Sequence, residues 1–510
     1  MSTTKVLLRC IPLLCISFFP TGCNTPWDSS NNSDDASRST SASTIKNPFD
    51  ELKFMYDWNK QTDAFICSSI SANNNLVSVG VSFDPLDVPK NKKVLDALEV
   101  EIAQRYGDAV IVVGREERLS ILNLEMVDCS VLGSIRSLVA VEFVEAKYVT
   151  PVSEEELFED VLEMQYRAAV MRSSGQDRVS GDQLNDEELF NPGLYDETDY
   201  ELTYVEYIRQ IDETIADRLE RHGLNRIYEE FGFYGAPTVG VAIIDNGVFE
   251  DHVDYLSEGD GNFDVEGYVR SFAADQPDGP YPRTYDLFGL MPLLGGMFNH
   301  GTIQTKLVYT TAPNINIKSV RASPFVFWFI PVQFQGVVDA ILALAEDPSI
   351  RVISSSMGTV VHVHEIERAI AYFNARDKIF VSAGGTSMPY LRDVVQVVFP
   401  ANLASTITTT GIRHTQDNDG EFILGEIAHG GEEIDFVVDH TKDSSQSVST
   451  TAGMIGLLWS YNPSLKRDQI IDILVRSSSY YKKNGKKDSI FGWGKIDIYD
   501  AFIEVKKLTD

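Results

Sequence analysis

The sequence predicts an α/β protein with a mainly parallel sheet covered by helices on both faces, preceded by a small β-α-β-β-α-β unit. The chain has 510 residues, 43% of them hydrophobic, which is enough for two or three domains with cores. From residue 216 to residue 507, apolar strand-like runs alternate with helical stretches, as in a parallel sheet. Residues 74–150 contain the shorter pattern of the first unit.

The first 22 residues are predicted to be a secretory leader. Lys5 and Arg9 supply a positive start, and the apolar run 11–19 is too short to span a bilayer. This end resembles a bacterial lipoprotein signal, in which Cys23 would become the lipid-bearing N-terminus. An ordinary secretory signal cut nearby is the alternative. Either way we expect export, and the resemblance implies a lipid anchor in the bacterial cell envelope, at the periplasm or outer membrane.

Two polar segments are predicted to connect the parts of the chain. Residues 23–73 begin with a Ser-, Asn- and Asp-rich stretch that cannot bury enough apolar surface to fold, and we interpret them as a tether. Residues 151–215 form an acidic linker with one or two helices. This linker could bind calcium, but it lacks the Asp-x-Asp-x-Asp-Gly pattern. Outside the leader region only Cys67 and Cys129 remain, and an oxidising compartment would permit a bridge between them.

The formal net charge is −32, which argues against nucleic acid as a partner because phosphate binding needs a basic surface. We attribute the acidity to solubility.

The elements of the small unit follow from periodicity. Alternating or short apolar runs predict strands, and two stretches with helical spacing predict helices. In chain order these are strand 76–83, helix 93–106, strand 109–114, strand 118–126, helix 129–138 and strand 139–146.

Two motifs in the larger unit carry candidate chemistry. In VGVAIIDNG at 239–247, an apolar run ends in Asp245 and is followed by Asn-Gly. Asp245 would lie at the edge of a buried strand, where open α/β sheets place their sites, although Asp-Asn-Gly is also an ordinary turn. In NHGT, His300 begins a helix, and the sequence returns to a strand after Ala-Pro-Asn at 312–314. This ordered combination closely resembles the subtilisin-like serine peptidases.

Further segments resemble that family in the same order, over roughly 220–505. Ser356, Met357 and Gly358 match the strand end that lines the substrate cleft, and Gly385 aligns with the oxyanion asparagine. The matching segments are 350–358, 379–385, 399–412, 430–438, 456–465 and 491–502.

The family's nucleophile motif aligns with DSSQSVSTTAG at 443–453. A gapless alignment puts Gly453 on the motif's last glycine and makes Ser445 the nucleophile. An alternative register, suggested by Ser-Val-Ser-Thr variants, would make Ser447 the nucleophile. That register shortens the helix by two residues and puts Ile455 where close packing requires glycine, so we prefer Ser445.

Several residues depart from the family pattern. Asp443 replaces a glycine, Ser449 replaces a proline, and Gln-Thr-Lys at 304–306 replaces Val-Ala-Gly. Gly385 has no side chain to donate to an oxyanion, and removing that donor typically reduces turnover by about 10²–10³.

The resemblance implies a serine endopeptidase that acts on peptides or proteins without a cofactor. In it, Ser445 attacks, His300 is the general base and Asp245 orients the imidazole. The cleft strand 356–358 would pair with the substrate as an added strand. A catalytically inactive peptide- or protein-binding module is the alternative.

The small unit is similar to the propeptide of such peptidases, especially at 132–146. The resemblance implies that this unit is an intramolecular inhibitor and folding template. The alternative is an unrelated accessory domain.

One further pair of residues could bind a metal. In VHVHE at 361–365, His362 and His364 would lie on one face of a strand. Because no third ligand lies at convincing spacing, we interpret this segment as a surface strand and predict no metal site.

Overall fold

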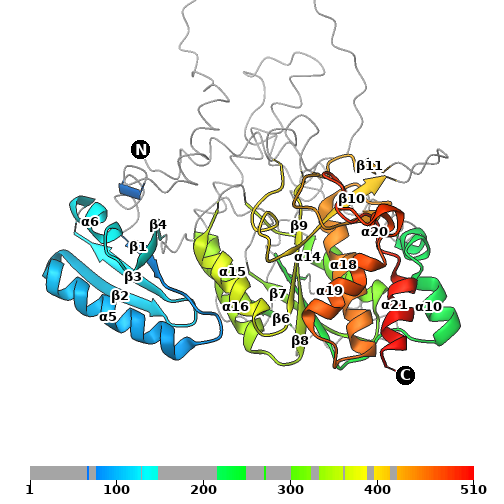
Figure 1. The fold of residues 1–510 in the computed structure, drawn as a ribbon, viewed down its shortest axis with the longest axis horizontal. Coiled ribbons are helices and arrows are strands. Elements are labelled where there is room, and N and C mark those ends of the chain that lie inside the picture. The colour runs from blue at the N-terminus through cyan, green and yellow to red at the C-terminus, as the bar shows by residue number, and fades with distance from the viewer. Residues whose placement is uncertain are drawn as a thin grey trace, which may run out of the picture.

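The computed structural model describes ten segments, which form two units that lie side by side in Figure 1. Cys23, the leader and most of the predicted tether and linker lie outside them. Within these segments, no helix is long and apolar enough to cross a membrane. The described residues are 66–67, 76–127, 129–147, 215–248, 269–271, 300–322, 332–359, 362–386, 396–413 and 422–509.

The first unit has the predicted β-α-β-β-α-β order, and its four strands form an antiparallel sheet in the order β2-β3-β1-β4. Its longer helix, α5, begins after Asp87, whose side chain accepts a hydrogen bond from the Lys90 amide and caps the helix. The elements are β1 (Leu76–Val81), α5 (Val88–Tyr106), β2 (Val110–Glu116), β3 (Ile121–Met126), α6 (Leu132–Arg136) and β4 (Val141–Ala146).

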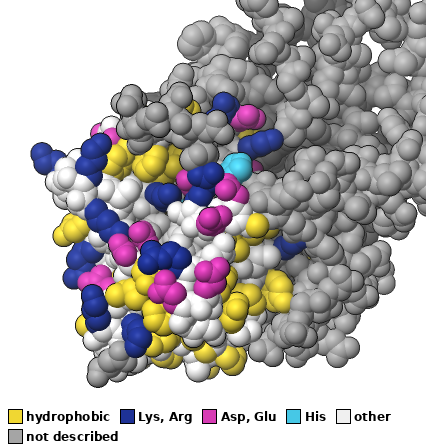
Figure 2. Space-filling model, turned by 90° about the vertical axis from the view of Figure 1, so that its right-hand side faces the viewer, with side chains coloured by type: hydrophobic (Ala, Val, Ile, Leu, Met, Phe, Trp, Pro, Cys, Tyr) yellow, Lys and Arg dark blue, Asp and Glu magenta, His cyan; other side chains and the backbone are white. Residues whose placement is uncertain are grey.

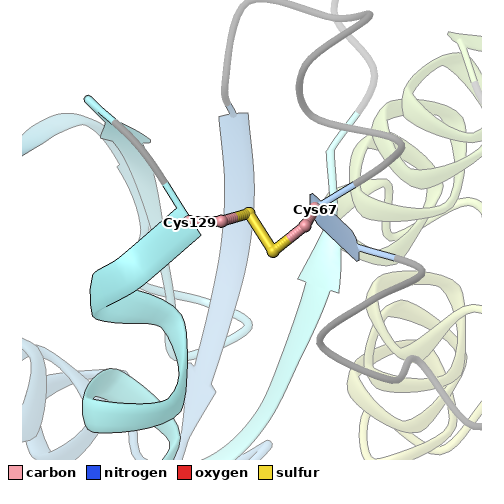
Figure 3. Close-up of a disulfide and its surroundings, with 2 residues drawn as sticks. All are labelled: Cys67 and Cys129. Carbon is pink, nitrogen blue, oxygen red and sulfur yellow. A yellow bond between two sulfur atoms is a disulfide. The ribbon is translucent and has the colours of Figure 1, made fainter.

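A disulfide joins Cys67 to Cys129 at one end of this unit (Figure 3), with their Cα atoms 5.6 Å apart. Ile66 beside it is fully buried in the core of the unit. Residues 66–67, which the tether prediction for 23–73 includes, therefore belong to the folded unit instead. The Ser-, Asn- and Asp-rich composition that suggested a tether covers only residues 24–46, whereas Phe65, Ile66 and Ile70 form a short apolar stretch that the prediction overlooked.

The larger unit contains an eight-stranded, mainly parallel sheet, as predicted, in the order β11-β10-β9-β8-β5-β7-β6, with β12 pairing β10. Only β11 runs antiparallel to its neighbour among the pairings of the described strands. The strands are β5 (Gly240–Asp245), β6 (Val269–Ser271), β7 (Asn316–Arg321), β8 (Ile350–Ser355), β9 (Ile379–Ala383), β10 (Ile407–Arg413), β11 (Ile423–Leu424) and β12 (Phe436–Asp439).

Helices cover both faces of this sheet (Figure 1). In β5, Val241 and Ile243 belong to the same core cluster as residues of α14 and α18, while Ala242 and Ile244 pack with α15 and α16. Alternate strand residues point to opposite faces, so a strand buried on both sides is apolar throughout. The helices are α10 (Leu224–Phe231), α14 (His300–Thr311), α15 (Val332–Glu346), α16 (His364–Asn374), α18 (Ser444–Tyr461), α19 (Arg467–Arg476), α20 (Ser479–Asn484) and α21 (Ile498–Lys507).

The surface strand predicted at 361–365 is not formed over its described residues, 362–365. Instead, α16 begins at His364, and His362 lies just before the helix. The segment was misread because two histidines separated by one residue fit a strand period, whereas the helical apolar pattern starts only at Ile366.

Acidic and basic side chains alternate over the face that carries α10, α20 and α21 (Figure 2). Partly exposed pairs such as Arg476–Glu504, 2.9 Å apart, lie on this surface. Each such pair contributes little to stability in water. The excess negative charge is therefore not concentrated on this face.

The two units meet through helix α16 of the larger unit. Arg368, largely buried, donates to the backbone carbonyls of Leu119 and Ser120 at 2.8 and 3.0 Å, and to Glu142 at 2.7 Å. Leu119 also packs within the apolar cluster that contains α15 and α16. The contact therefore combines an apolar core with hydrogen bonds from a charged side chain.

We expect the double substitution Cys67→Ser/Cys129→Ser to lower the free energy of unfolding of the small unit by about 2–4 kcal/mol. The bridge closes a loop between residues 62 positions apart, and its loss frees the unfolded chain. Hydrogen exchange of peptides from 76–147, followed by mass spectrometry, measures the change. A reducing agent should accelerate hydrogen exchange in the unaltered protein and should not change the exchange rate of the double variant. Equal exchange rates in all samples would contradict the prediction.

Candidate active site

The first part of the site is a carboxylate–imidazole pair at the carboxyl edge of the parallel sheet. Asp245 is the last residue of β5 and His300 is the first residue of α14. The Nδ1 atom of His300 lies 2.9 Å from each carboxylate oxygen of Asp245. Asp245 is fully buried, and its Oδ1 also accepts a hydrogen bond from the Asn246 amide. The carboxylate therefore fixes the orientation of the imidazole ring through Nδ1 and leaves Nε2 on the side away from Asp245.

Backbone contacts hold these two elements together. A Cβ atom at Gly301 would lie 2.1 Å from the carbonyl oxygen of Gly247, so the residue after His300 must be a glycine. Asn246 accepts a hydrogen bond from the Gly301 amide at 2.9 Å. The Asp-Asn-Gly turn and the His-Gly helix start therefore fit each other, which explains their joint occurrence in the sequence.

The second part of the site is the N-terminus of α18. Asp443 caps this helix by accepting from the Gln446 amide at 2.9 Å. The carbonyl of Ser445 accepts a hydrogen bond from the Ser356 hydroxyl at 3.0 Å. Ser444 donates to the Gly385 carbonyl at 2.8 Å. The start of α18 thus meets both segments that the resemblance assigns to the cleft, the one at 356 and the one at 385.

The hydroxyl of Ser447 lies elsewhere. It is fully buried, donates to the Asp443 carbonyl at 3.2 Å, and lies 3.0 Å from the Thr441 hydroxyl. A Cβ atom at Gly453 would lie 2.7 Å from Thr311 of α14, so this glycine allows the two helices to pack closely. This is the role that the Ser445 register assigns to position 453.

The imidazole of His300 has an unexpected partner. Among the described residues, the side chain that contacts its Nε2 is Gln304, at 3.4 Å, rather than Ser445. Gln304 in turn accepts from Ser449 at 2.8 Å, and Ser449 lies 3.3 Å from Ser354. Two of the departures from the family pattern, Gln304 and Ser449, therefore contact each other. A single sequence does not reveal such a pairing, since the two residues are 145 positions apart.

A second compensating contact occurs at Gly385. This residue has φ +132°, and a Cβ atom there would lie 2.5 Å from Nδ1 of the buried His429. An asparagine at 385 would require both a strained backbone and movement of the His429 ring. Sequence reasoning missed His429, because no motif surrounds it.

The electrostatic environment affects the titration of His300. Burial lowers the pKa of the imidazole, but the charge of Asp245 and the hydrogen bond to it outweigh burial, so the pKa is raised. The protonated imidazole therefore contributes to the stability of the folded protein. This contribution is complete below the usual pKa of about 6.5 and is lost as the pH rises through the higher pKa of the folded state.

We expect Asp245→Asn to lower the pKa of His300, because the burial remains while the negative charge is removed. Titration of the imidazole resonance by NMR measures the shift, with His300→Gln used to assign the signal. An unchanged titration curve in Asp245→Asn would show that the carboxylate does not control the imidazole.

Comparison with known proteins gives a family. The sequence profile of the subtilase family matches residues 237–494, more than half of the chain. No curated protein matches the chain in a sequence comparison.

Several solved structures are similar to this chain at low sequence identity. One is fervidolysin from Fervidobacterium pennivorans, a keratinolytic enzyme related to subtilisin, with 16% identity and a TM-score of 0.48. The alignment covers 84% of this chain and 61% of fervidolysin. Another is the epidermin leader peptide processing serine protease EpiP from Staphylococcus aureus, with 15% identity and a TM-score of 0.49, covering 84% of this chain and 98% of that one. On the strength of the profile match, the chain belongs to the subtilase family.

Proposed function

We propose that the protein is an exported serine endopeptidase in which Ser445, His300 and Asp245 form the triad. The observation that carries the proposal is the contact between His300, the first residue of α14, and the fully buried Asp245. Hydrolysis of peptide bonds agrees with membership of the subtilase family.

The proposed reaction follows from the direction of the hydrogen bond between His300 and Asp245. With Nδ1–H donated to Asp245, Nε2 is free to take the proton of the Ser445 hydroxyl as the oxygen attacks the scissile carbonyl carbon. The imidazolium, stabilised by Asp245, then gives this proton to the leaving amine. Water attacks the acyl-enzyme by the same general-base route and releases the acid product with free Ser445.

Before the first step, His300 must exchange its contact with Gln304 for one with Ser445. Catalytic hydrogen bonds often tighten only when substrate binds. The amide of Gln304 is held by Ser449, so this exchange moves both side chains. We propose that Gln304 keeps the imidazole in place until the substrate arrives.

The oxyanion would be stabilised weakly. The backbone amide of Ser445 remains as a donor, whereas Gly385 supplies no side chain. The hydroxyl of Thr386 lies 2.9 Å from the Ser444 hydroxyl, at the start of α18, and is the side chain next to the missing donor. Loss of one oxyanion donor typically reduces turnover by about 10²–10³, so we expect a slow enzyme.

The substrate is proposed to be a peptide or protein segment in an extended conformation. Ser356, Met357 and Gly358 follow the end of β8, and Ser356 is anchored to the Ser445 carbonyl. An extended chain added beside them would bring its backbone to the start of α18. No cofactor enters these steps.

The small unit is proposed to act as an intramolecular inhibitor. Its docking on α15 and α16 through Arg368 supports this role. The Cys67–Cys129 bridge supports an oxidising, extracytoplasmic location. Anchoring to the bacterial envelope through a lipid on Cys23 is part of the same proposal.

A second candidate function is a peptide- or protein-binding module without catalysis. The contact of Gln304 with His300 and the absence of a side chain at Gly385 favour it. Labelling of the nucleophile distinguishes the two functions.

We expect a fluorophosphonate probe to label Ser445 in the purified protein. Ser445→Ala should abolish labelling, and His300→Ala should slow it by about 10³ or more, because the general base is lost. The labelled residue is identified by mass spectrometry of the digested protein.

Ser447→Ala is the matched control, because its hydroxyl bonds to Thr441 and Asp443 and should leave labelling intact. Labelling lost in this variant alone would overturn the assignment of Ser445. No labelling of any variant, with folding verified by circular dichroism, would favour the binding module.

We expect Arg368→Gln to raise the labelling rate at least about tenfold. This substitution removes the charged side chain that donates to Leu119, Ser120 and Glu142 of the small unit. A hydrogen bond to a charged group contributes about 1.5–3 kcal/mol, and about 1.4 kcal/mol changes an equilibrium constant tenfold, so docking should weaken by at least that factor. Arg413→Gln is the control, since Arg413 is exposed and pairs only weakly with its neighbour. An equal rate in both variants and the unaltered protein would argue against inhibition by the small unit.

A further inference from the structure

Two histidines and a glutamate gather at the start of α16, close to the small unit. His362, His364 and Glu367, here called the His-Glu cluster, each offer one ligand atom, and these atoms lie within 4.8 Å of one another. All three residues are partly exposed, so their side chains can adjust by rotation. The third ligand that the sequence did not reveal is therefore present, contributed by the first turn of a helix.

The local fold explains this juxtaposition. His364 is the first residue of α16, and Glu367 lies three residues later, on the same helix face. His362 approaches from the preceding loop, with Nε2 2.9 Å from a Glu367 oxygen and its ring centroid 4.6 Å from that of His364.

The small unit supplies a partner for this cluster. Glu145 of β4 is buried, and its Oε1 lies 3.3 Å from Nδ1 of His364. Phe143 of the same strand stacks on the His364 ring, with centroids 4.3 Å apart. A histidine that donates Nδ1–H to a carboxylate presents an unprotonated Nε2, which is the usual arrangement behind a metal-binding histidine.

We propose that the His-Glu cluster binds a divalent transition metal of the Zn²⁺ class, with His362, His364 and Glu367 as ligands and Glu145 as the orienting carboxylate. Two imidazoles with one carboxylate suit Zn²⁺, whereas Ca²⁺ prefers a shell of six to eight oxygens. The carboxylates of Glu367 and Glu145 together balance the charge of the ion. Water completes a tetrahedral shell.

The site would connect metal binding to the docking of the two units. All three ligands belong to the larger unit, while the orienting carboxylate and the stacked ring belong to the small unit. Metal affinity is then higher in the docked state, and by reciprocity the metal stabilises docking. This inference does not depend on peptidase activity, because it concerns residues outside the triad.

Titration of the metal-free full-length protein with Zn²⁺ in a calorimeter tests the proposal, with Co²⁺ absorption as a spectroscopic measure of tetrahedral coordination. We expect one tight site per chain. His364→Gln and Glu367→Gln should each weaken the affinity by about 100-fold or more, and Glu145→Gln by about 10–100-fold, as is typical of orienting partners. Folding of each variant is verified by circular dichroism.

His440→Gln is the matched control, because His440 also pairs with a carboxylate, that of Asp217, at a partly exposed position. It should bind Zn²⁺ like the unaltered protein. Failure of the unaltered protein to bind at micromolar Zn²⁺ would overturn the proposal. Binding that survives His364→Gln and Glu367→Gln undiminished would also overturn it, since the ion would then lie elsewhere, for example at the Asp245–His300 pair.

Discussion

The close packing of α14 against α18 is the constraint on which the site depends. Gly453 lets α18 approach Thr311, and Gly301 lets α14 approach the turn after β5. These contacts bring three separate segments to one edge of the sheet: the end of β5, the start of α14 and the start of α18. A side chain larger than hydrogen at either glycine would separate elements that must meet within hydrogen-bond distance.

The departures from the family pattern are not independent losses. Gln304 stands where the family has a valine and Ser449 where it has a proline, yet the two side chains form a hydrogen bond next to His300. Gly385 lacks the oxyanion side chain, and the ring of His429 fills the space where its Cβ would point. A buried polar group without a partner is costly, and the hydrogen bond between Gln304 and Ser449 gives each of these side chains a partner. The site is therefore rebuilt as a packed polar network around an intact Asp–His pair.

The contact between the two units joins apolar and ionic interactions on one helix. Arg368 binds the small unit through two carbonyls and a carboxylate, and Glu365 pairs with Lys147 at 3.2 Å. The His-Glu cluster lies at the start of the same helix, facing Glu145. Separation of the two units would expose these charged groups, so a ligand that binds to them would alter docking.

The sequence by itself determined the two-unit order, the parallel sheet and the positions of Asp245 and His300. These follow from local patterns: an apolar run for a strand buried on both faces, and glycine-containing turns at its end. Only the tertiary structure decided which side chain contacts Nε2 of His300, what fills the space at Gly385, and that Ile66 belongs to the small unit. It also replaced the predicted strand at 361–365 by a helix start. The space at Gly385 and the burial of Ile66 depend on residues far apart in the chain, and Gln304 beside His300 is held by Ser449, 145 positions away. Periodicity carries no information about such contacts.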